Sequence, residues 1–472
     1  MTDKDDTSAC YLPATRLIEL YEWKTLSPLE VTKAVLARMH SVNDAVNAFC
    51  HIDEEAALAA AAESEARWMN GEPRGLIDGI PVSIKDIMLV KGQVCGRGSK
   101  LTQDNPRERF DSPAVARLRE HGAIILGRTA TPEFGWKGIT DSPLTGVTRN
   151  PWDTSKTPGG SSGGAAAAAA LGMGALHVGT DGGGSVRIPA GFTGVFALKP
   201  TFGRVPVFPE SAMGTLSHIG PLTRTVEDAA MMMNVMVQPD PRDWFALPYD
   251  PWDFRTGLDL GVRHLTVAFS PTLGFAEVDP EVAEIVADAV KVLEEQGATI
   301  EEVDPGFDDP QDMFQKLWYG GAARQLDKLP EDRWDELDPG FVEIAEEGRG
   351  FSLDDYMDAV DARTALGRKM NLFHETYDLL VTPTLPIPAF EAGQELSGRA
   401  GEKRWMDWTP FSYPFNLTGQ PAASVPCGFT TAGLPVGMQI VGPRYADPLV
   451  MRAAGAFEQV RPFVMPEAPN IV

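Results

Sequence analysis

Amphipathic helical patterns and short apolar runs alternate along most of the chain. Residues 27–42 begin with a serine cap followed three residues later by glutamate, and residues 53–71 end on glycine, so residues 1–70 are predicted to form a helical region. Further helices are predicted at residues 112–122, 225–236, 279–297 and 447–460. Strands are predicted at residues 79–90, 123–129, 175–180, 264–270, 298–303, 377–386, 422–429 and 435–442. The alternation predicts an α/β fold with a central mixed, mostly parallel β-sheet covered by helices on both faces.

Two stretches interrupt this alternation. Residues 239–261 are rich in proline and aspartate, which is typical of a surface connection. The region from about 304 to 365 is acidic, aromatic and helical, and it forms either a cap over the site or a peripheral helical layer. Neither an internal repeat nor a change in composition marks a linker, so we predict one large domain over residues 1–472.

The charge balance excludes some classes of partner. The chain has 41 Lys and Arg against 66 Asp and Glu, a net charge of -25, so its field repels nucleic acid and anionic membranes. The four cysteines at positions 10, 50, 95 and 427 are far apart and contain no C-x-x-C motif, so free thiols are expected. With no signal-peptide pattern at the amino terminus and no membrane-spanning apolar run, we expect a cytoplasmic protein.

Residues 156–190 concentrate glycine and serine but offer no well-placed histidine. None of the seven histidines lies at a metal-ligand spacing, so no metal or other cofactor is expected. The GGSSG motif at 159–163 matches the nucleophile elbow of α/β-hydrolases, but turn-forming residues with two prolines precede it instead of a strand. A neutral lysine can serve as base where histidine is absent, and Lys85 lies in an apolar run. A salt bridge with the adjacent Asp86 is the alternative role for this lysine.

Three consecutive glycines, Gly182, Gly183 and Gly184, precede Ser185. Glycine allows successive N–H groups to converge in a concave nest, which is the arrangement that an oxyanion requires. A simple tight turn is the alternative interpretation of the triplet.

The chain resembles the amidase signature family from about residue 15 to 460. The resemblance rests on these motifs: GIPVSIKD, NPWDTSKTPGGSSGG, GTDGGGSVRIPAGFTGVFALKPTFGRV, GPLTRTVEDAA, DLLVTPTLP, FNLTGQPAASVPCGF and GLPVGMQIVGPRYADPLVMRAAGAFE. It implies an amidase that cleaves a carboxamide to a carboxylic acid and ammonia or an amine through an acyl-enzyme.

By motif, the family's catalytic triad falls on Lys85, on Ser161 after a cis peptide bond, and on the nucleophile Ser185. The resemblance also implies an oxyanion hole built from the backbone of Gly182, Gly183, Gly184 and Ser185. Asp181, Arg187 and Ser162 match supporting positions, and Gly135 and Trp136 match the acyl pocket of relatives.

Two departures from the family pattern stand out. Relatives commonly carry a side chain at the position of Gly182, so we expect a looser loop or more room beside the acyl group. An alanine run replaces a frequent serine after GGSSGG, and we expect it to pack silently in a buried helix.

The expected partner is a small-molecule amide, with a homodimer left open, and aromatic residues near 318 and 405–415 could enclose an apolar or aryl amide. The leading hypothesis is a free-standing amidase. One alternative is the glutaminase subunit of a tRNA-dependent amidotransferase, and another is a catalytically silent binding protein on the same scaffold.

Overall fold

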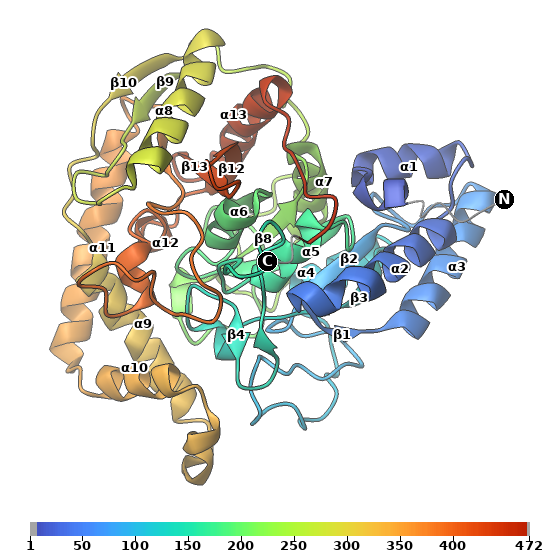
Figure 1. Ribbon diagram of the computed structural model, residues 1–472, viewed down its shortest axis with the longest axis horizontal. Coiled ribbons are helices and arrows are strands. Elements are labelled where there is room, and N and C mark those ends of the chain that lie inside the picture. Colours follow the sequence, from blue (N-terminus) through green and yellow to red (C-terminus); the bar gives the residue numbers. More distant parts are fainter. Residues whose placement is uncertain (1–6, 470–472) are drawn as a thin grey trace.

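A large twisted β-sheet runs through the centre of the computed structural model, which describes residues 7–469 (Figure 1). Eleven strands within these residues form it in the order β1-β3-β2-β6-β8-β7-β12-β13-β11-β9-β10. The strands are β1 (Phe49–Ile52), β2 (Pro81–Lys85), β3 (Ile124–Thr129), β6 (Leu176–Asp181), β7 (Phe196–Lys199), β8 (His218–Thr223), β9 (Thr266–Phe269), β10 (Thr299–Glu302), β11 (Leu379–Pro383), β12 (Ala422–Phe429) and β13 (Pro435–Val441). Strands β4 (Asp141–Ser142) and β5 (Gly146–Val147) form a separate antiparallel pair.

The predicted α/β fold with a large mixed sheet is confirmed. Parallel pairing joins β3, β2 and β6 at one end and β11, β9 and β10 at the other. These are four of the ten neighbouring pairs described, a smaller parallel share than the pattern predicts, and the remaining six are antiparallel. Strands β1, β7 and β8, which the sequence analysis missed, enter the sheet antiparallel, and a tight turn at Thr430–Gly433 makes β12 and β13 a hairpin.

Helices cover both faces of the sheet. They are α1 (Ala14–Glu22), α2 (Pro28–Val46), α3 (Glu54–Asn70), α4 (Pro113–Glu120), α5 (Gly163–Ala170), α6 (Arg187–Thr193), α7 (Val226–Met236), α8 (Pro280–Glu295), α9 (Gln311–Leu326), α10 (Pro339–Arg349), α11 (Leu353–Phe373), α12 (Pro414–Leu417) and α13 (Asp447–Val460). Ala197 of β7 packs with α5 and α6, whereas its neighbours Phe196 and Leu198 belong to the core that includes α7, α8 and α13. Because side chains alternate along a strand, these two sets of helices lie on opposite faces.

The two regions singled out as helical are largely so. Within residues 7–70 the helices α1, α2 and α3 form as expected, but β1 lies between α2 and α3 and pairs with β3; residues 1–6 lie outside the described part. Helices α9, α10 and α11 make up most of the region from 304 to 365 and form a layer at one side of the molecule (Figure 1). This layer shares a second apolar core with residues 405–417.

The alanine run forms α5, in which all eight residues are buried, as expected. No disulfide joins any of the four cysteines, all of which lie within residues 7–469. Among residues 7–469, no helix has both the length and the apolar character that crossing a bilayer requires.

Candidate active site

Lys85 is the last residue of β2, a strand buried along its whole length, and its side chain is completely buried. Its Nζ lies 2.6 Å from Ser161 Oγ, 2.9 Å from Ser162 Oγ and 2.9 Å from Thr180 Oγ1. The alternative role for this lysine fails because Asp86 instead pairs with Arg128, with 2.5 Å between Oδ1 and Nε. Three hydroxyl groups therefore surround the amine, and no carboxylate within residues 7–469 forms an ion pair with it.

This environment changes the protonation of the lysine. Burial lowers the pKa of Lys85 from 10.5 to about 7, and the negative charge of Asp181 opposes part of that shift. A charged ammonium loses its hydration in such a site, whereas a neutral amine loses little. About half of the lysines are consequently neutral at pH 7 and able to accept a proton.

Ser161 and Ser162 lie immediately before α5, and the Gly160–Ser161 peptide bond is cis. A Cβ atom at position 160 would lie 2.3 Å from the carbonyl oxygen of Ile139, so only glycine fits there. The backbone N–H of Ser162 donates to the carbonyl of Ser185 at 3.1 Å, which ties the two serine segments together.

The glycine triplet follows β6 and leads to Ser185. Gly184 has a φ of +127°, and its N–H donates to Asp181 Oδ1 at 2.8 Å. The expectation that Gly184 supplies an oxyanion donor is therefore wrong, because a carboxylate already occupies its N–H. The N–H groups of Gly182, Gly183 and Ser185 donate to no protein acceptor among the described residues. These three remain available to a ligand.

Neighbouring aromatic rings leave no room for side chains on this loop. A Cβ atom at Gly182 would lie 2.9 Å from Trp318 Cζ3, and one at Gly183 would lie 2.7 Å from Phe314 Cζ. Trp318 is fixed by a 3.1 Å hydrogen bond from Nε1 to the Trp136 carbonyl and by stacking on Phe314. The expectation of extra room beside Gly182 is also wrong, because Trp318 fills that space.

A buried ion pair braces the loop. Arg187 bonds Asp181 through Nε and Nη2, each at 3.0 Å, as the supporting roles of these two residues require. Burial alone would raise the pKa of Asp181, but Arg187 and the Asn416 amide hold it well below its usual value. The remaining guanidinium hydrogens go to the Asn416 and Gln439 side chains and to the Ser412 carbonyl. No motif in the sequence points to these three partners, which come from distant segments.

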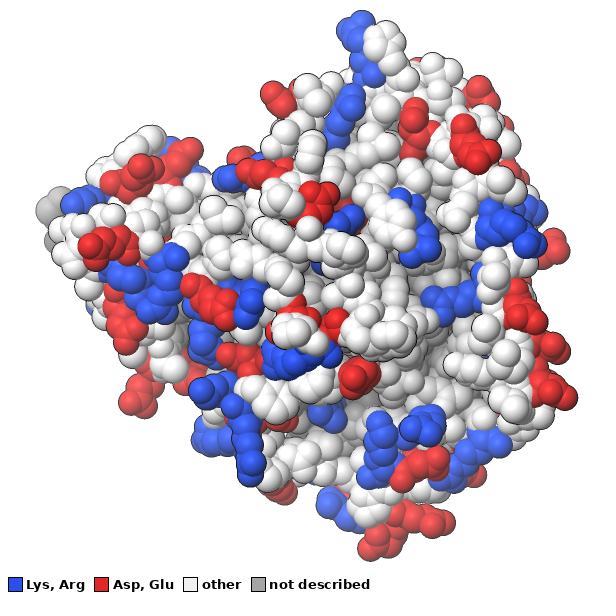
Figure 2. Space-filling view, turned by 180° about the vertical axis from the view of Figure 1, so that it is seen from behind, with Lys and Arg blue, Asp and Glu red and all other residues white. Residues whose placement is uncertain are grey.

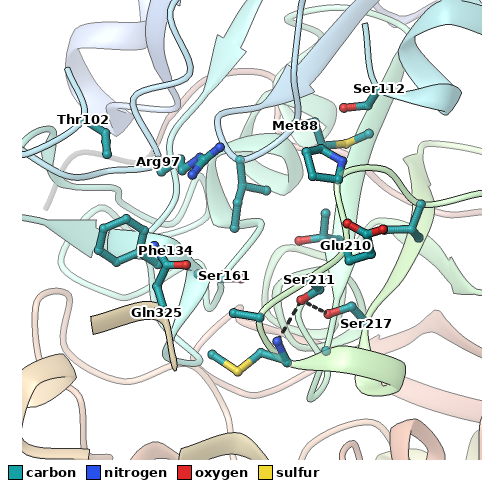
Figure 3. A pocket seen from close by; sticks show the side chains of 18 of the residues that line it. Met88, Arg97, Thr102, Ser112, Phe134, Ser161, Glu210, Ser211, Ser217 and Gln325 are labelled. Atoms are coloured by element: carbon teal, nitrogen blue, oxygen red, sulfur yellow. Dashed lines mark hydrogen bonds between the residues drawn. The ribbon is translucent and has the colours of Figure 1, made fainter. Parts of the chain in front are cut away.

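Ser161 and Ser185 face one cavity of about 500 Å³ (Figure 3). Gly135 lines this cavity, as expected, but Trp136 does not, because its ring is completely buried in the second core. Phe134 and Trp318 provide the aromatic wall instead. Trp318 and Gln325 come from α9, so the helical layer from 304 to 365 contributes to the cavity.

The site therefore combines a buried lysine of lowered pKa with two adjacent serines and a nest of free N–H groups. This combination is typical of hydrolases that use a serine nucleophile with a lysine base. Ser185 Oγ has no hydrogen-bond partner within residues 7–469. It is the serine that lies directly beside the nest.

The comparisons with known proteins agree with this class. The amidase family model matches residues 30–451. The chain is 38% identical to an acylamidase of Rhodococcus erythropolis over 96% of both chains. It is also 35% identical to one of the subunits of the glutamyl-tRNA(Gln) amidotransferase of Gloeobacter violaceus, over 92% of this chain and 94% of that one. The crystal structure of a bacterial aryl acylamidase of the amidase signature family superposes with a TM-score of 0.89 and 31% identity, covering 96% of each chain.

The chain therefore belongs to the amidase signature family. It is an amidase, a hydrolase of carbon–nitrogen bonds in linear amides.

Proposed function

We propose that this protein is a free-standing amidase that hydrolyses a small carboxamide through an acyl-enzyme on Ser185. Ser185 Oγ attacks the carbonyl carbon, and the C–N bond breaks as the tetrahedral intermediate collapses. The acid portion stays on Ser185 as an ester, and ammonia or an amine leaves. Water then attacks the ester by the same route and restores the free serine.

The proton moves from Ser185 through Ser161 to Lys85. Ser162 Oγ donates its own hydrogen to the Thr180 carbonyl at 3.2 Å, so it accepts a hydrogen from the Lys85 amine. Thr180 Oγ1 takes the second hydrogen of a neutral amine, and the nitrogen lone pair faces the Ser161 hydroxyl. Ser161 gives its proton to Lys85 while it takes the proton of Ser185, and the sequence reverses to protonate the leaving amine.

The oxyanion that forms on the carbonyl is held by backbone donors. The free N–H groups of Gly182, Gly183 and Ser185 are preorganised by the Asp181–Arg187 pair. Donors that are already in place stabilise the developing charge without reorganisation, which is worth about 3–4 kcal/mol for one such donor.

The observation that carries the proposal is the completely buried Lys85 among three hydroxyl groups. Two measurements test the proposal. Labelling with a fluorophosphonate followed by peptide mapping identifies the nucleophile, and release of nitroaniline from 4-nitroacetanilide measures turnover. We expect one label on Ser185 and loss of both label and turnover in Ser185→Ala. A label on Ser161 or Ser162 would refute the assignment of the nucleophile.

A second candidate is the glutaminase component of an amidotransferase, favoured by the 35% identity to one of the subunits of such an enzyme. The same triad would then release ammonia from glutamine for a partner. Co-purification of a second chain, with glutamine hydrolysed faster than neutral anilides, would decide for this candidate.

A further inference from the structure

The cavity beside Ser185 combines an apolar wall with a positive side chain. Ile87, Met88, Phe134, Met213 and Trp318 supply apolar surface. Arg97 comes from the loop after β2, and its guanidinium extends into the cavity between Phe134 and Met88 (Figure 3).

The loop that carries Arg97 is fixed by its backbone. Arg97 has a φ of +51°, and its carbonyl accepts a 2.8 Å hydrogen bond from the Phe134 N–H. The adjacent Gly98 has a φ of +64°, and a Cβ atom there would lie 2.6 Å from the Thr131 carbonyl oxygen. The guanidinium therefore projects from a well-defined place on the wall.

Within residues 7–469, no carboxylate forms an ion pair with Arg97. The buried arginines Arg128 and Arg187, by contrast, pair with Asp86 and Asp181. The side-chain partner of Arg97 is the Cys95 thiol, which is neutral because burial raises its pKa. A half-buried guanidinium without a carboxylate partner is a binding site for an anion.

The charges that line the cavity differ from those of the chain as a whole. The chain carries a net charge of -25, and acidic and basic side chains are interspersed over the face in Figure 2. Among the described residues that line the cavity, Glu210 is the only acid, and the cations are Arg97 and Lys328. Glu210 is exposed and lies on the side of Ser211 and Ser217, away from Arg97 (Figure 3).

We propose that the substrate is an amide that also bears a carboxylate, separated from the scissile bond by an apolar body, and that Arg97 binds this carboxylate. The proposal rests on the proposed function, because the amide has to lie at Ser185 while its carboxylate reaches Arg97 in the same cavity. The guanidinium presents parallel N–H donors that match the two oxygens of a carboxylate. The apolar body lies against Phe134 and Trp318.

Binding to Ser185→Ala protein tests the proposal without turnover. Calorimetry would compare acetanilide with 4-acetamidobenzoate, and hexanamide with the monoamide of adipic acid. The first pair places the carboxylate on the amine portion, and the second places it on the acyl portion. In at least one pair we expect the carboxylate to improve affinity roughly ten- to hundredfold, and the gain to shrink as salt is added.

Arg97→Gln in the same background should abolish that gain, and Arg97→Lys should keep part of it, because the charge remains without the fork. Arg109→Gln removes the same charge from an exposed residue outside the cavity and should leave the gain intact. Absence of a gain in both pairs, or its persistence in Arg97→Gln, would overturn the proposal. Unfolding midpoints show that each variant is folded.

The outcome is separable from that of the proposed function. If Arg97 has no role in binding a carboxylate, the wild-type enzyme still releases nitroaniline from a neutral anilide and Ser185 is still labelled. If the triad is wrong, labelling and turnover fail, whereas the calorimetric preference for carboxylates can still be measured.

Discussion

The pKa of Lys85 makes the pH dependence of this enzyme a direct test of its base. Burial lowers the pKa of Lys85 from 10.5 to about 7, and a change of this size corresponds to about 5 kcal/mol. With the ordinary pKa only roughly one lysine in 3,000 would be neutral at pH 7, against about half here. The rate should therefore rise as the pH increases through about 7 and level off above it, because the neutral amine is the active form.

The assay is the pH profile of kcat/KM with a neutral anilide, since this parameter reports the ionisations of the free enzyme. A second group, next to the cavity-lining Phe134, could produce the same rise in rate near pH 7, because burial also raises the pKa of Glu133 to about 7. Glu133→Gln is therefore the matched control and should keep the limb near pH 7. The histidine that lines the cavity, His218, cannot produce this limb, because burial holds its pKa well below 6.5.

Lys85→Ala removes the base and the end of the proton path together. We expect kcat to fall by roughly 10³ to 10⁴, the scale of general-base catalysis, or about 4–5.5 kcal/mol. Lys85→Arg should lose nearly as much, because a guanidinium stays protonated. A limb near pH 10.5, a limb that disappears in Glu133→Gln, or a Lys85→Ala enzyme with a tenth of wild-type turnover would refute the lysine mechanism.

Three other perturbations test the surrounding structure. Gly182→Ala should lower kcat more than tenfold because its Cβ meets Trp318, and Trp318→Leu in the same chain should restore part of the rate; equal rates in the single and double variants would contradict this contact. Asp181→Asn should lower the unfolding free energy by about 3–5 kcal/mol in urea denaturation, since it leaves Arg187 buried without its charge partner. Lys85→Met should be more stable relative to the wild type at low pH than at high pH. Between about pH 7 and 10.5 the unfolding free energy of the wild type should rise relative to that of the variant by about 1.4 kcal/mol per pH unit, because the unfolded lysine binds a proton that the folded lysine has released. A constant difference over that range would show that the folded lysine has an ordinary pKa.

Local pattern predicted the parts of the site that are continuous in sequence. The apolar run around Lys85 indicated a buried strand, and the resemblance placed Ser161 and Ser185, which the structure brings to one cavity. The resemblance does not distinguish a ring in the core from one on the cavity wall, so it places Trp136 beside the substrate although this side chain is completely buried.

The remaining features depend on contacts between distant segments. Trp318 reaches Gly182 from α9, and Asn416 reaches Arg187 from α12. Neither contact leaves a periodic signal in the sequence, because each joins one side chain to a loop far along the chain. The blocked N–H of Gly184 depends likewise on the orientation of the Asp181 side chain, which composition does not determine.

The two arginine–aspartate pairs explain how a lysine keeps a lowered pKa beside acidic residues. Asp86 follows Lys85 directly, but its carboxylate is held by Arg128, and the Asp181 carboxylate is held by Arg187. An aspartate free to pair with Lys85 would favour the ammonium and raise its pKa, as Asp181 does in part even now. Each arginine therefore has an electrostatic effect on the base as well as a structural role. Within residues 7–469 the buried amine has hydroxyl partners only, and these, unlike a carboxylate, do not hold it in the ammonium form.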